Sequence, residues 1–425
     1  MNSKEIYKKT ILENGIRVVT EKIDYVRSIS IGAWIDVGSR DEEKDEMGVS
    51  HFIEHMLFKG TKKRTAKEIA SSLESVGGAL NAFTSREHTC YFARVLDEHL
   101  DIALDVISDI LKNALLSPAH FEKEKEVILS EIKELEDSPA DLVHDLLMST
   151  IWEENSLGRP IIGSADSVLK MTRSKLVDYM KRNYTCSQVV IAASGNLKHE
   201  VLVDKIRRKF QFSTDHRATV DSQKPPLAGR NRLVEKRRTA QIHVTLGCPL
   251  FPYRDKRRYS ALVLTNILGG GMSSRLFQTV REKLGLAYSI YSFVDFFEDA
   301  GVFGIYLGTD KKKVVQVLDL VMKEITQLRR NSLSSEELSH AKSQLKGSLM
   351  LAQESTSNRM NRLARYELLL RDFVSLDETV ESINKIRARD VISVAEDFLH
   401  PDNMSVVVLG PVANNTFNKV DWNKL

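Results

Sequence analysis

Hydrophobic and polar residues follow two different periods along this chain, which predicts a mixture of strands and helices. Residues 6–12 and 16–21 are strand-like and flank Asn14-Gly15, a dipeptide that favours a tight hairpin turn. Residues 29–37 are mostly apolar, as in a strand whose two faces are both buried. The other elements expected in the first half are a strand or hairpin at 81–96, a strand at 189–193, and helices at 65–75, 98–114, 118–136, 173–183 and 199–210.

A polar segment at 213–231 interrupts this pattern. It contains Pro225-Pro226 and Gly229, a composition typical of an exposed linker. The elements expected after it are strands at 241–246 and 302–307 and helices at 255–268, 274–284, 311–330, 334–352, 357–371 and 387–399.

The two halves align with each other at a fixed offset of 215 residues, which places Met171 opposite Ile386 and Gly195 opposite Gly410. This agreement favours a duplicated architecture, although an α/β chain can show it by chance. We therefore expect an N-terminal half at 1–212 and a homologous C-terminal half at 232–425, joined by the linker at 213–231.

Composition describes an ordinary globular protein that is too long for a single core. The chain has 425 residues, of which 42% are hydrophobic and 28% charged, and its net charge is only +3. This balance gives no indication of nucleic-acid binding, and no apolar run approaches the roughly 20 residues of a membrane span. The first residues lack the apolar core of a secretory signal. Three scattered cysteines suit a reducing compartment, so we expect a cytoplasmic protein.

The first candidate catalytic residues lie in the segment 48–60, whose apolar residues predict a largely buried helix. It contains His51, Glu54 and His55 in the pattern H-x-x-E-H. Positions i, i+3 and i+4 share one face of a helix, so both imidazoles and the carboxylate point the same way. Two neutral imidazoles can hold a zinc ion while a nearby carboxylate acts as a base. Two histidines in a core are the alternative, but a carboxylate buried among apolar residues is costly unless it is paired or near a metal.

A third ligand is expected on the helix at 118–136. Glu124 and Glu131 lie seven residues apart there, on one stripe with Ile128. Most other carboxylates of this helix pair with lysines at helical spacing and form a solvated face. The spacing alone leaves open whether Glu131 is a ligand or a surface residue.

His51-Phe-Ile-Glu-His55, followed by Glu131 in Val-Ile-Leu-Ser-Glu-Ile, resembles the pitrilysin/insulinase family of zinc metallopeptidases. The likeness is greatest to its short members, the mitochondrial processing peptidase β-subunit and its bacterial homologues, and covers nearly the whole chain. It implies that His51, His55 and Glu131 bind one Zn²⁺ per chain. It also implies that Glu54 is the general base and that Glu124 supports the site from behind the ligands.

The resemblance also implies a fold and a mode of substrate binding. The fold is an α+β, α/β-sandwich arrangement of two homologous halves, each a mostly antiparallel sheet with helices packed on one face, closing as a clamshell on peptides or unfolded segments. Asn81, Ala82 and Phe83 match the substrate-binding edge strand of the family, where a peptide adds through main-chain hydrogen bonds. Arg281 and Tyr288 match an Arg and a Tyr that reach the active site from the second half and could stabilise an oxyanion.

Several alternatives remain open. Without the resemblance, Asn81 would be a strand residue near a turn, Arg281 a surface helix residue and Tyr288 a strand core residue. The glycine-rich segment 268–277 lacks the lysine and spacing of a phosphate-binding loop and is expected to be a sharp bend between helices.

The second half is expected to lack the metal site. The offset of 215 places Asn266, Gly269 and Gly270 opposite the three motif residues, and no carboxylate occupies 346–350. The protein could also be a non-catalytic core subunit of the same fold, or be active only beside a different partner, although we expect a homodimer. A purely structural zinc site is disfavoured because three ligands and a base leave one coordination position open.

Overall fold

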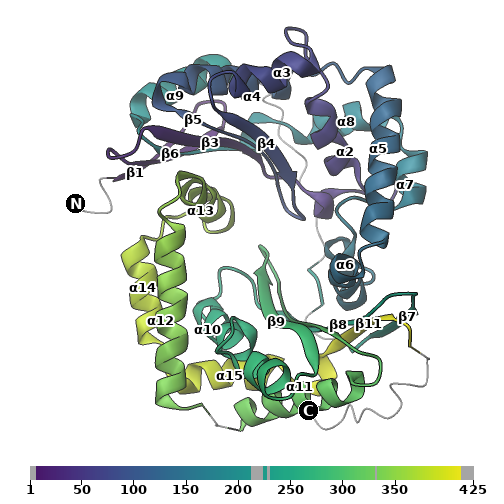
Figure 1. Ribbon diagram of the computed structural model, residues 1–425. Coiled ribbons are helices and arrows are strands. Elements are labelled where there is room, and N and C mark those ends of the chain that lie inside the picture. The colour runs from purple at the N-terminus through teal and green to yellow at the C-terminus, as the bar shows by residue number, and fades with distance from the viewer. Residues whose placement is uncertain (1–5, 212–223, 227–229, 331–332, 413–425) are drawn as a thin grey trace. The chain divides into compact units, whose positions relative to one another are not determined.

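The computed structural model describes residues 6–211, 224–226, 230–330 and 333–412 (Figure 1). The chain divides into two compact units. The first comprises Met1–Lys133, Arg159–Ser222 and Ala352–Ser375, and the second comprises Glu134–Gly158, Gln223–Leu351 and Leu376–Leu425. Each unit has a sheet and a hydrophobic core of its own.

The first unit is built on a six-stranded sheet with the order β1-β2-β6-β3-β5-β4. Its strands are β1 (Tyr7–Ile11), β2 (Arg17–Lys22), β3 (Ser28–Ile35), β4 (Ala79–Thr84), β5 (Thr89–Leu96) and β6 (Val189–Gly195). The hairpin expected around Asn14-Gly15 is present, because β1 pairs antiparallel with β2. The only parallel pair of described strands here is β2 with β6, so the sheet is mostly antiparallel, as expected.

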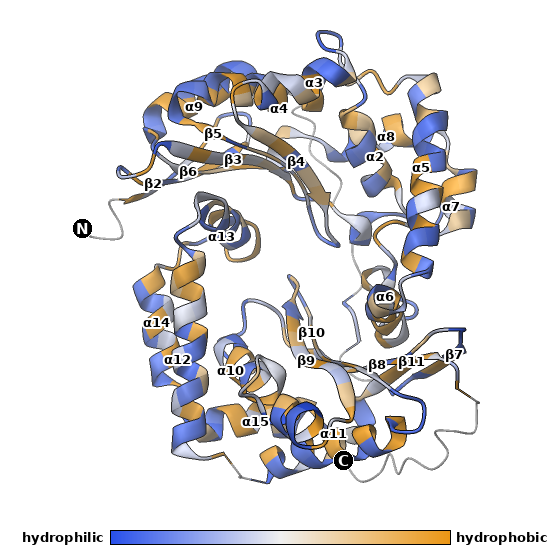
Figure 2. Ribbon diagram, viewed as in Figure 1, coloured by the Kyte–Doolittle hydropathy of each residue, from blue (hydrophilic) through white to orange (hydrophobic). Residues whose placement is uncertain are grey.

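Helices of the first unit pack on one face of this sheet or against one another. They are α2 (Val49–Leu57), α3 (Ala66–Glu74), α4 (Leu100–Asn113), α5 (Pro118–Glu136, which runs on past the unit's boundary), α7 (Ala165–Lys170), α8 (Arg173–Asn183) and α9 (His199–Lys209). Apolar side chains of α4 and α9 share a buried core with Ile29, Ile31 and Ile35 of β3. Hydrophobic residues accordingly lie along the strands and on the sheet-facing sides of the helices (Figure 2).

The second unit repeats this sheet with five strands in the order β7-β11-β8-β10-β9. They are β7 (Arg232–Lys236), β8 (Ile242–Leu250), β9 (Ala287–Phe296), β10 (Gly301–Thr309) and β11 (Ser405–Gly410). Only β11 and β7 are parallel among them, so order and pairing sense both match β2-β6-β3-β5-β4 of the first unit. The α+β fold of two homologous halves is therefore confirmed.

The helices of the second unit include elements that the periodicity predicted and two that lie outside the expected ranges. They are α6 (Pro139–Ile151), α10 (Arg258–Gly269), α11 (Val314–Arg329), α12 (Ser335–Ala352), α14 (Leu376–Lys385) and α15 (Ala388–Phe398). The helix expected at 274–284 is a wider π-helical segment, η5 (Phe277–Lys283). Helices α6 and α14 and strands β7 and β9 lie outside the ranges expected from the sequence.

Two helices are exchanged between the halves of the sequence. Helix α13 (Thr356–Leu369) follows the linker in sequence but belongs to the first unit, where Met360 and Leu363 pack with Trp34 of β3. Helix α6 precedes the linker but belongs to the second unit, where Leu147 packs with Val407 of β11. Each sheet therefore gains a helix on its second face, which explains why β3 is buried from its second residue to its last.

The assignment of the sequence to halves at 1–212 and 232–425 stays a prediction. Most of the expected linker, namely 213–223 and 227–229, lies outside the described residues.

Candidate metal centre

Helix α2 carries the H-x-x-E-H motif on the face that it turns away from the core. Phe52, Ile53 and Met56 of this helix are buried, whereas His51 and Glu54 are partly exposed. Figure 1 shows the helix between α5 and β4, which bring the other groups of the site.

The start of α2 is held by a buried carboxyl group. Glu42 accepts hydrogen bonds from the backbone N–H groups of Gly48 (2.7 Å) and Ser50 (2.9 Å), and so satisfies donors that a helix leaves unpaired at its N-terminus. Gly48 has φ 92°, a left-handed conformation that favours glycine. Burial raises the pKa of Glu42 to about 8.

His51, His55 and Glu131 meet in one cluster. Each offers one ligand atom, and these atoms all lie within 4.8 Å of one another. Oε2 of Glu131 lies 3.5 Å from Nε2 of His55 and 3.9 Å from Nε2 of His51. The two imidazole rings are 4.7 Å apart between centroids. Across the described parts of the chain, this is the only group of three or more such residues close enough to hold a metal ion.

This donor set fits zinc. Four ligands at about 2.0–2.2 Å in a tetrahedron lie roughly 3.3–3.6 Å from one another. The separations of 3.5 and 3.9 Å from Glu131 to the two imidazoles are close to that range. Three protein ligands leave a fourth position open, as in catalytic rather than structural zinc sites.

Glu124 contacts the imidazole of His55 at Nδ1, the ring nitrogen that does not face Glu131. It is 2% exposed, and its Oε2 lies 3.2 Å from Nδ1 of His55. Its other oxygen forms an ion pair of 2.9 Å with Nζ of Lys59. A carboxylate on Nδ1 orients an imidazole so that its Nε2 lone pair faces the metal position. Nδ1 of His51, in contrast, is buried without a hydrogen-bond partner among the described residues.

Both the protonation of His51 and the basicity of Glu54 follow from their surroundings. Burial, followed by the charge of His55, lowers the pKa of His51 to about 4, so this imidazole is neutral at neutral pH and free to bind a cation. Burial raises the pKa of Glu54 above its ordinary value. Thr84 of β4 opposes that rise, because its hydroxyl donates a hydrogen bond of 2.5 Å to Oε2 of Glu54.

Strand β4, which contains Asn81, Ala82 and Phe83, is the edge strand of the first sheet. It pairs with β5 on one side, and no described strand pairs with its other side. Asn81 and Phe83 are exposed. The strand ends at Thr84, the residue that contacts Glu54, so its free edge runs toward the motif.

Arg281 and Tyr288 belong to the second unit. Arg281 lies in η5 with its guanidinium 4.9 Å from the ring centroid of Phe277. Tyr288 is on β9 and 60% exposed, so it is not a core residue. That these two side chains approach the His51 cluster stays a prediction.

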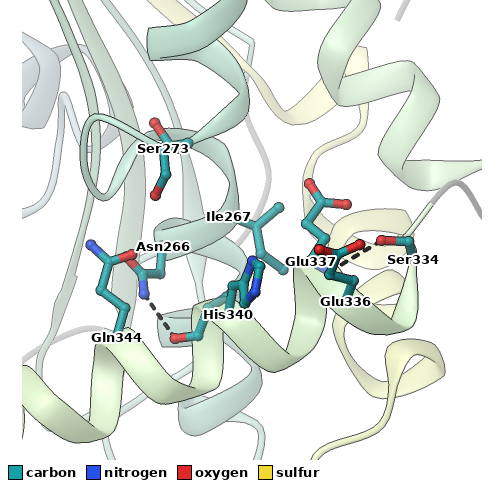
Figure 3. Close-up of a pocket in the computed structure, with 10 residues that line it drawn as sticks. Asn266, Ile267, Ser273, Ser334, Glu336, Glu337, His340 and Gln344 are labelled. Atoms are coloured by element: carbon teal, nitrogen blue, oxygen red, sulfur yellow. Dashed lines mark hydrogen bonds between the residues drawn. The ribbon is translucent and has the colours of Figure 1, made fainter.

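In the second unit, a pocket lies at α12 and at α10, the helix opposite α2 in the sequence offset (Figure 3). Its volume is about 210 Å³, and its lining includes Asn266 of α10 with His340 and Gln344 of α12. Asn266, opposite His51 in the sequence offset, donates a hydrogen bond from Nδ2 to the carbonyl of Ala341 at 2.9 Å. This polar side chain therefore links α10 to α12.

Sequence reasoning missed three residues that shape the site. Glu42 is one of several acids in a charged loop, and nothing local marks it as a helix cap. Lys59 lies just beyond α2 and pairs across the fold. Thr84 directly follows the Asn81-Ala82-Phe83 segment, and its place at the end of an edge strand was the one available signal.

Comparison with known proteins shows matches to two family models. Residues 17–165 match the family model described as insulinase, peptidase family M16. Residues 170–345 match the model of the peptidase M16 inactive domain. An uncharacterized zinc protease of Streptomyces coelicolor is 40% identical over 97% of this chain and 91% of its own length. One of Bacillus subtilis is 40% identical over 96% of this chain and 99% of its own.

Solved structures agree at the level of the fold. A protease from Helicobacter pylori superposes with a TM-score of 0.90 at 22% identity, covering 95% of this chain and 99% of its own. A peptidase M16 inactive domain from Pseudomonas fluorescens gives a TM-score of 0.90 at 20% identity, covering 96% and 98%. Among the described residues, no helix is both long and apolar enough to cross a membrane.

Proposed function

Because the chain belongs to the insulinase family of peptidases, M16, we propose that it is a zinc-dependent endopeptidase that hydrolyses peptides or unfolded polypeptide segments. The observation that carries this proposal is the convergence of His51, His55 and Glu131, with Glu54 on the same face of α2. The zinc proteases that it resembles over nearly their whole length support the same conclusion.

His51, His55 and Glu131 would hold one zinc ion per chain. The ion, when bound, supplies a Lewis acid that polarises the scissile carbonyl and lowers the pKa of water. His51 is already neutral at neutral pH, and Glu124 keeps His55 in one orientation through Nδ1. His51 is therefore neutral and His55 is oriented before the ion binds, which favours a high zinc affinity.

Glu54 acts as the general base. Its raised pKa makes the carboxylate a better proton acceptor than an exposed glutamate, while the hydrogen bond from Thr84 limits the rise in pKa and fixes the position of the carboxylate. Glu54 takes a proton from the attacking water and then gives it to the nitrogen of the leaving amine. The peptide bond is thereby cleaved with no net change in the protonation of the enzyme.

The substrate binds as an added strand on β4. Asn81, Ala82 and Phe83 offer main-chain groups along the free edge, which gives affinity without demanding one sequence. Arg281 and Tyr288 contribute donors to the oxyanion that forms on the substrate. The active species is a cytoplasmic homodimer. A non-catalytic subunit is disfavoured because the metal cluster and its base are complete.

The test compares Glu54→Gln with Glu74→Gln, a control that removes the same charge from an exposed residue of α3. Cleavage of a quenched fluorescent peptide library and zinc content are measured for both. We expect Glu54→Gln to abolish cleavage and retain zinc, and Glu74→Gln to keep both. A wild-type protein that binds zinc but cleaves no peptide, alone or after mixing with candidate partners, would support the non-catalytic alternative.

A further inference from the structure

The two imidazoles of the metal cluster are held in different ways. Nδ1 of His55 contacts the carboxylate of Glu124 at 3.2 Å. Nδ1 of His51 is buried and has no hydrogen-bond partner within the part of the chain that the structure describes. A hydrogen bond at the second ring nitrogen is the usual means of orienting a metal-binding histidine. The direction of the His51 ring therefore depends on packing and on the position of the α2 backbone.

Glu42 holds that backbone at the turn just before His51. Its side chain is buried, and its two oxygens accept the backbone N–H groups of Gly48 at 2.7 Å and Ser50 at 2.9 Å. Ser50 directly precedes His51 in the chain. Because one carboxyl group binds both N–H groups, it fixes the first turn of α2 as a unit.

Two other segments pack against the same turn. The hydroxyl of Ser50 lies 3.1 Å from that of Tyr179 on α8, and both groups are buried. The backbone of Gly48 approaches the loop before α7 so closely that a Cβ there would lie 2.9 Å from the carbonyl oxygen of Ile162. These contacts limit where the turn can move, and they leave its N–H groups to Glu42.

The loop that carries Glu42 is itself attached to the hairpin turn between β4 and β5. The 3₁₀ turn η1 (Ser39–Asp41) directly precedes Glu42 and donates backbone hydrogen bonds to the carbonyls of Ser85 (3.2 Å) and Arg86 (2.8 Å). This hairpin turn follows Thr84, whose hydroxyl donates to the proposed general base. Glu42 therefore connects the start of the motif helix to the end of the edge strand.

We propose that Glu42 is a positioning residue that holds His51 in the direction needed for zinc binding. The inference rests on the proposed function, because it concerns the same metal ligands. Without the oxygens of Glu42, two buried N–H groups lose their acceptor, and the first turn of α2 becomes free to shift. His51 then samples more directions, and ordering it again lowers the zinc affinity. His55 lies one helical turn further on and keeps Glu124, so it is affected less.

The test compares the zinc affinity of wild type, Glu42→Ala and Glu42→Gln by competition with a chromophoric chelator. We expect Glu42→Ala to bind zinc about tenfold more weakly or worse. Glu42→Gln should lose less, because a glutamine keeps one acceptor oxygen. The matched controls are Glu43→Ala and Glu43→Gln, which change the exposed neighbour in the same loop and should bind zinc like the wild type.

Folding is checked by circular dichroism and thermal unfolding of the metal-free proteins. Should Glu42→Ala fail to fold, the comparison of Glu42→Gln with Glu43→Gln decides. Zinc affinity of Glu42→Gln within about twofold of the Glu43→Gln control would then overturn the proposal.

A second measurement separates positioning from stability. NMR of protein labelled at histidine follows the imidazole resonances of His51 and His55 during zinc addition, with assignments from His51→Gln and His55→Gln. We expect Glu42→Gln to alter mainly the resonances of His51, and Glu124→Gln to alter mainly those of His55. A lower melting temperature with unchanged His51 resonances and unchanged zinc affinity would overturn the proposal, as would equal changes at both imidazoles. A wild-type protein that binds no zinc would instead refute the metal site itself.

Discussion

Replacement of Glu124 by Gln tests whether the carboxylate behind His55 prepares the metal centre. The buried carboxylate of Glu124 contacts two donors, Nδ1 of His55 at 3.2 Å and Nζ of Lys59 at 2.9 Å. A glutamine has the same shape but only one acceptor oxygen and no charge. The side chain of Lys59 is 33% exposed, so Lys59 can turn to water while His55 keeps a neutral acceptor.

The expected loss follows from the difference between these hydrogen bonds. A hydrogen bond to a charged group contributes about 1.5–3 kcal/mol, and a neutral one about 0.5–1.5 kcal/mol. The difference is roughly 1–1.5 kcal/mol, which corresponds to about a tenfold lower zinc affinity. This agrees with the lower end of the 10- to 100-fold losses seen when partners of metal-binding histidines are replaced.

Zinc affinity is measured by competition with a chromophoric chelator, with thermal unfolding of the metal-free protein as a check on folding. The control is Glu126→Gln, which removes the same charge from an exposed position of α5 and should bind zinc like the wild type. If Glu124→Gln also binds zinc within about twofold of the wild type, Glu124 does not orient His55, and the reasoning is wrong.

Three other perturbations test separate parts of the structure. Thr84→Val removes the hydroxyl that limits the rise in the pKa of Glu54, so the acid limb of the kcat/KM profile should move to higher pH, measured by peptide cleavage. Burial lowers the pKa of His88 to about 4, so the unfolded chain binds its proton first as pH falls below about 6.5. The metal-free wild type should then lose about 2 kcal/mol more stability than His88→Gln between pH 7 and 5, measured by urea unfolding. Leu363→Ala, which opens a cavity between α13 and Trp34, should cost about 2–5 kcal/mol.

Each of these three has an outcome that contradicts it. An unchanged acid limb in Thr84→Val would mean that the hydroxyl does not influence the base. Parallel pH dependence of stability in wild type and His88→Gln would show that this imidazole is protonated in the folded protein. The control for Leu363 is Leu351→Ala, at a 68% exposed position of α12. Equal stability of the two variants would argue against the packing of α13 in the first unit.

The sequence was sufficient to predict most of the local structure. The hairpin at Asn14-Gly15, the buried strand β3 and the helices α2, α5 and α12 follow from turn chemistry and from the period of apolar residues. These signals depend on neighbours a few positions apart, so they can be read without the fold. The spacing of His51, Glu54 and His55 also belongs to this class, because one helix brings all three to the same face.

Only the tertiary structure decided the contacts between distant segments. Glu124 and His55 are 69 positions apart, and no periodicity indicates that they meet. The same holds for Thr84 beside Glu54. The exchange of α6 and α13 is the strongest case, because an apolar helix face predicts burial but not the sheet that will cover it. Hydrophobic attraction has no direction, and only the complementary shapes of the packed surfaces select the partner.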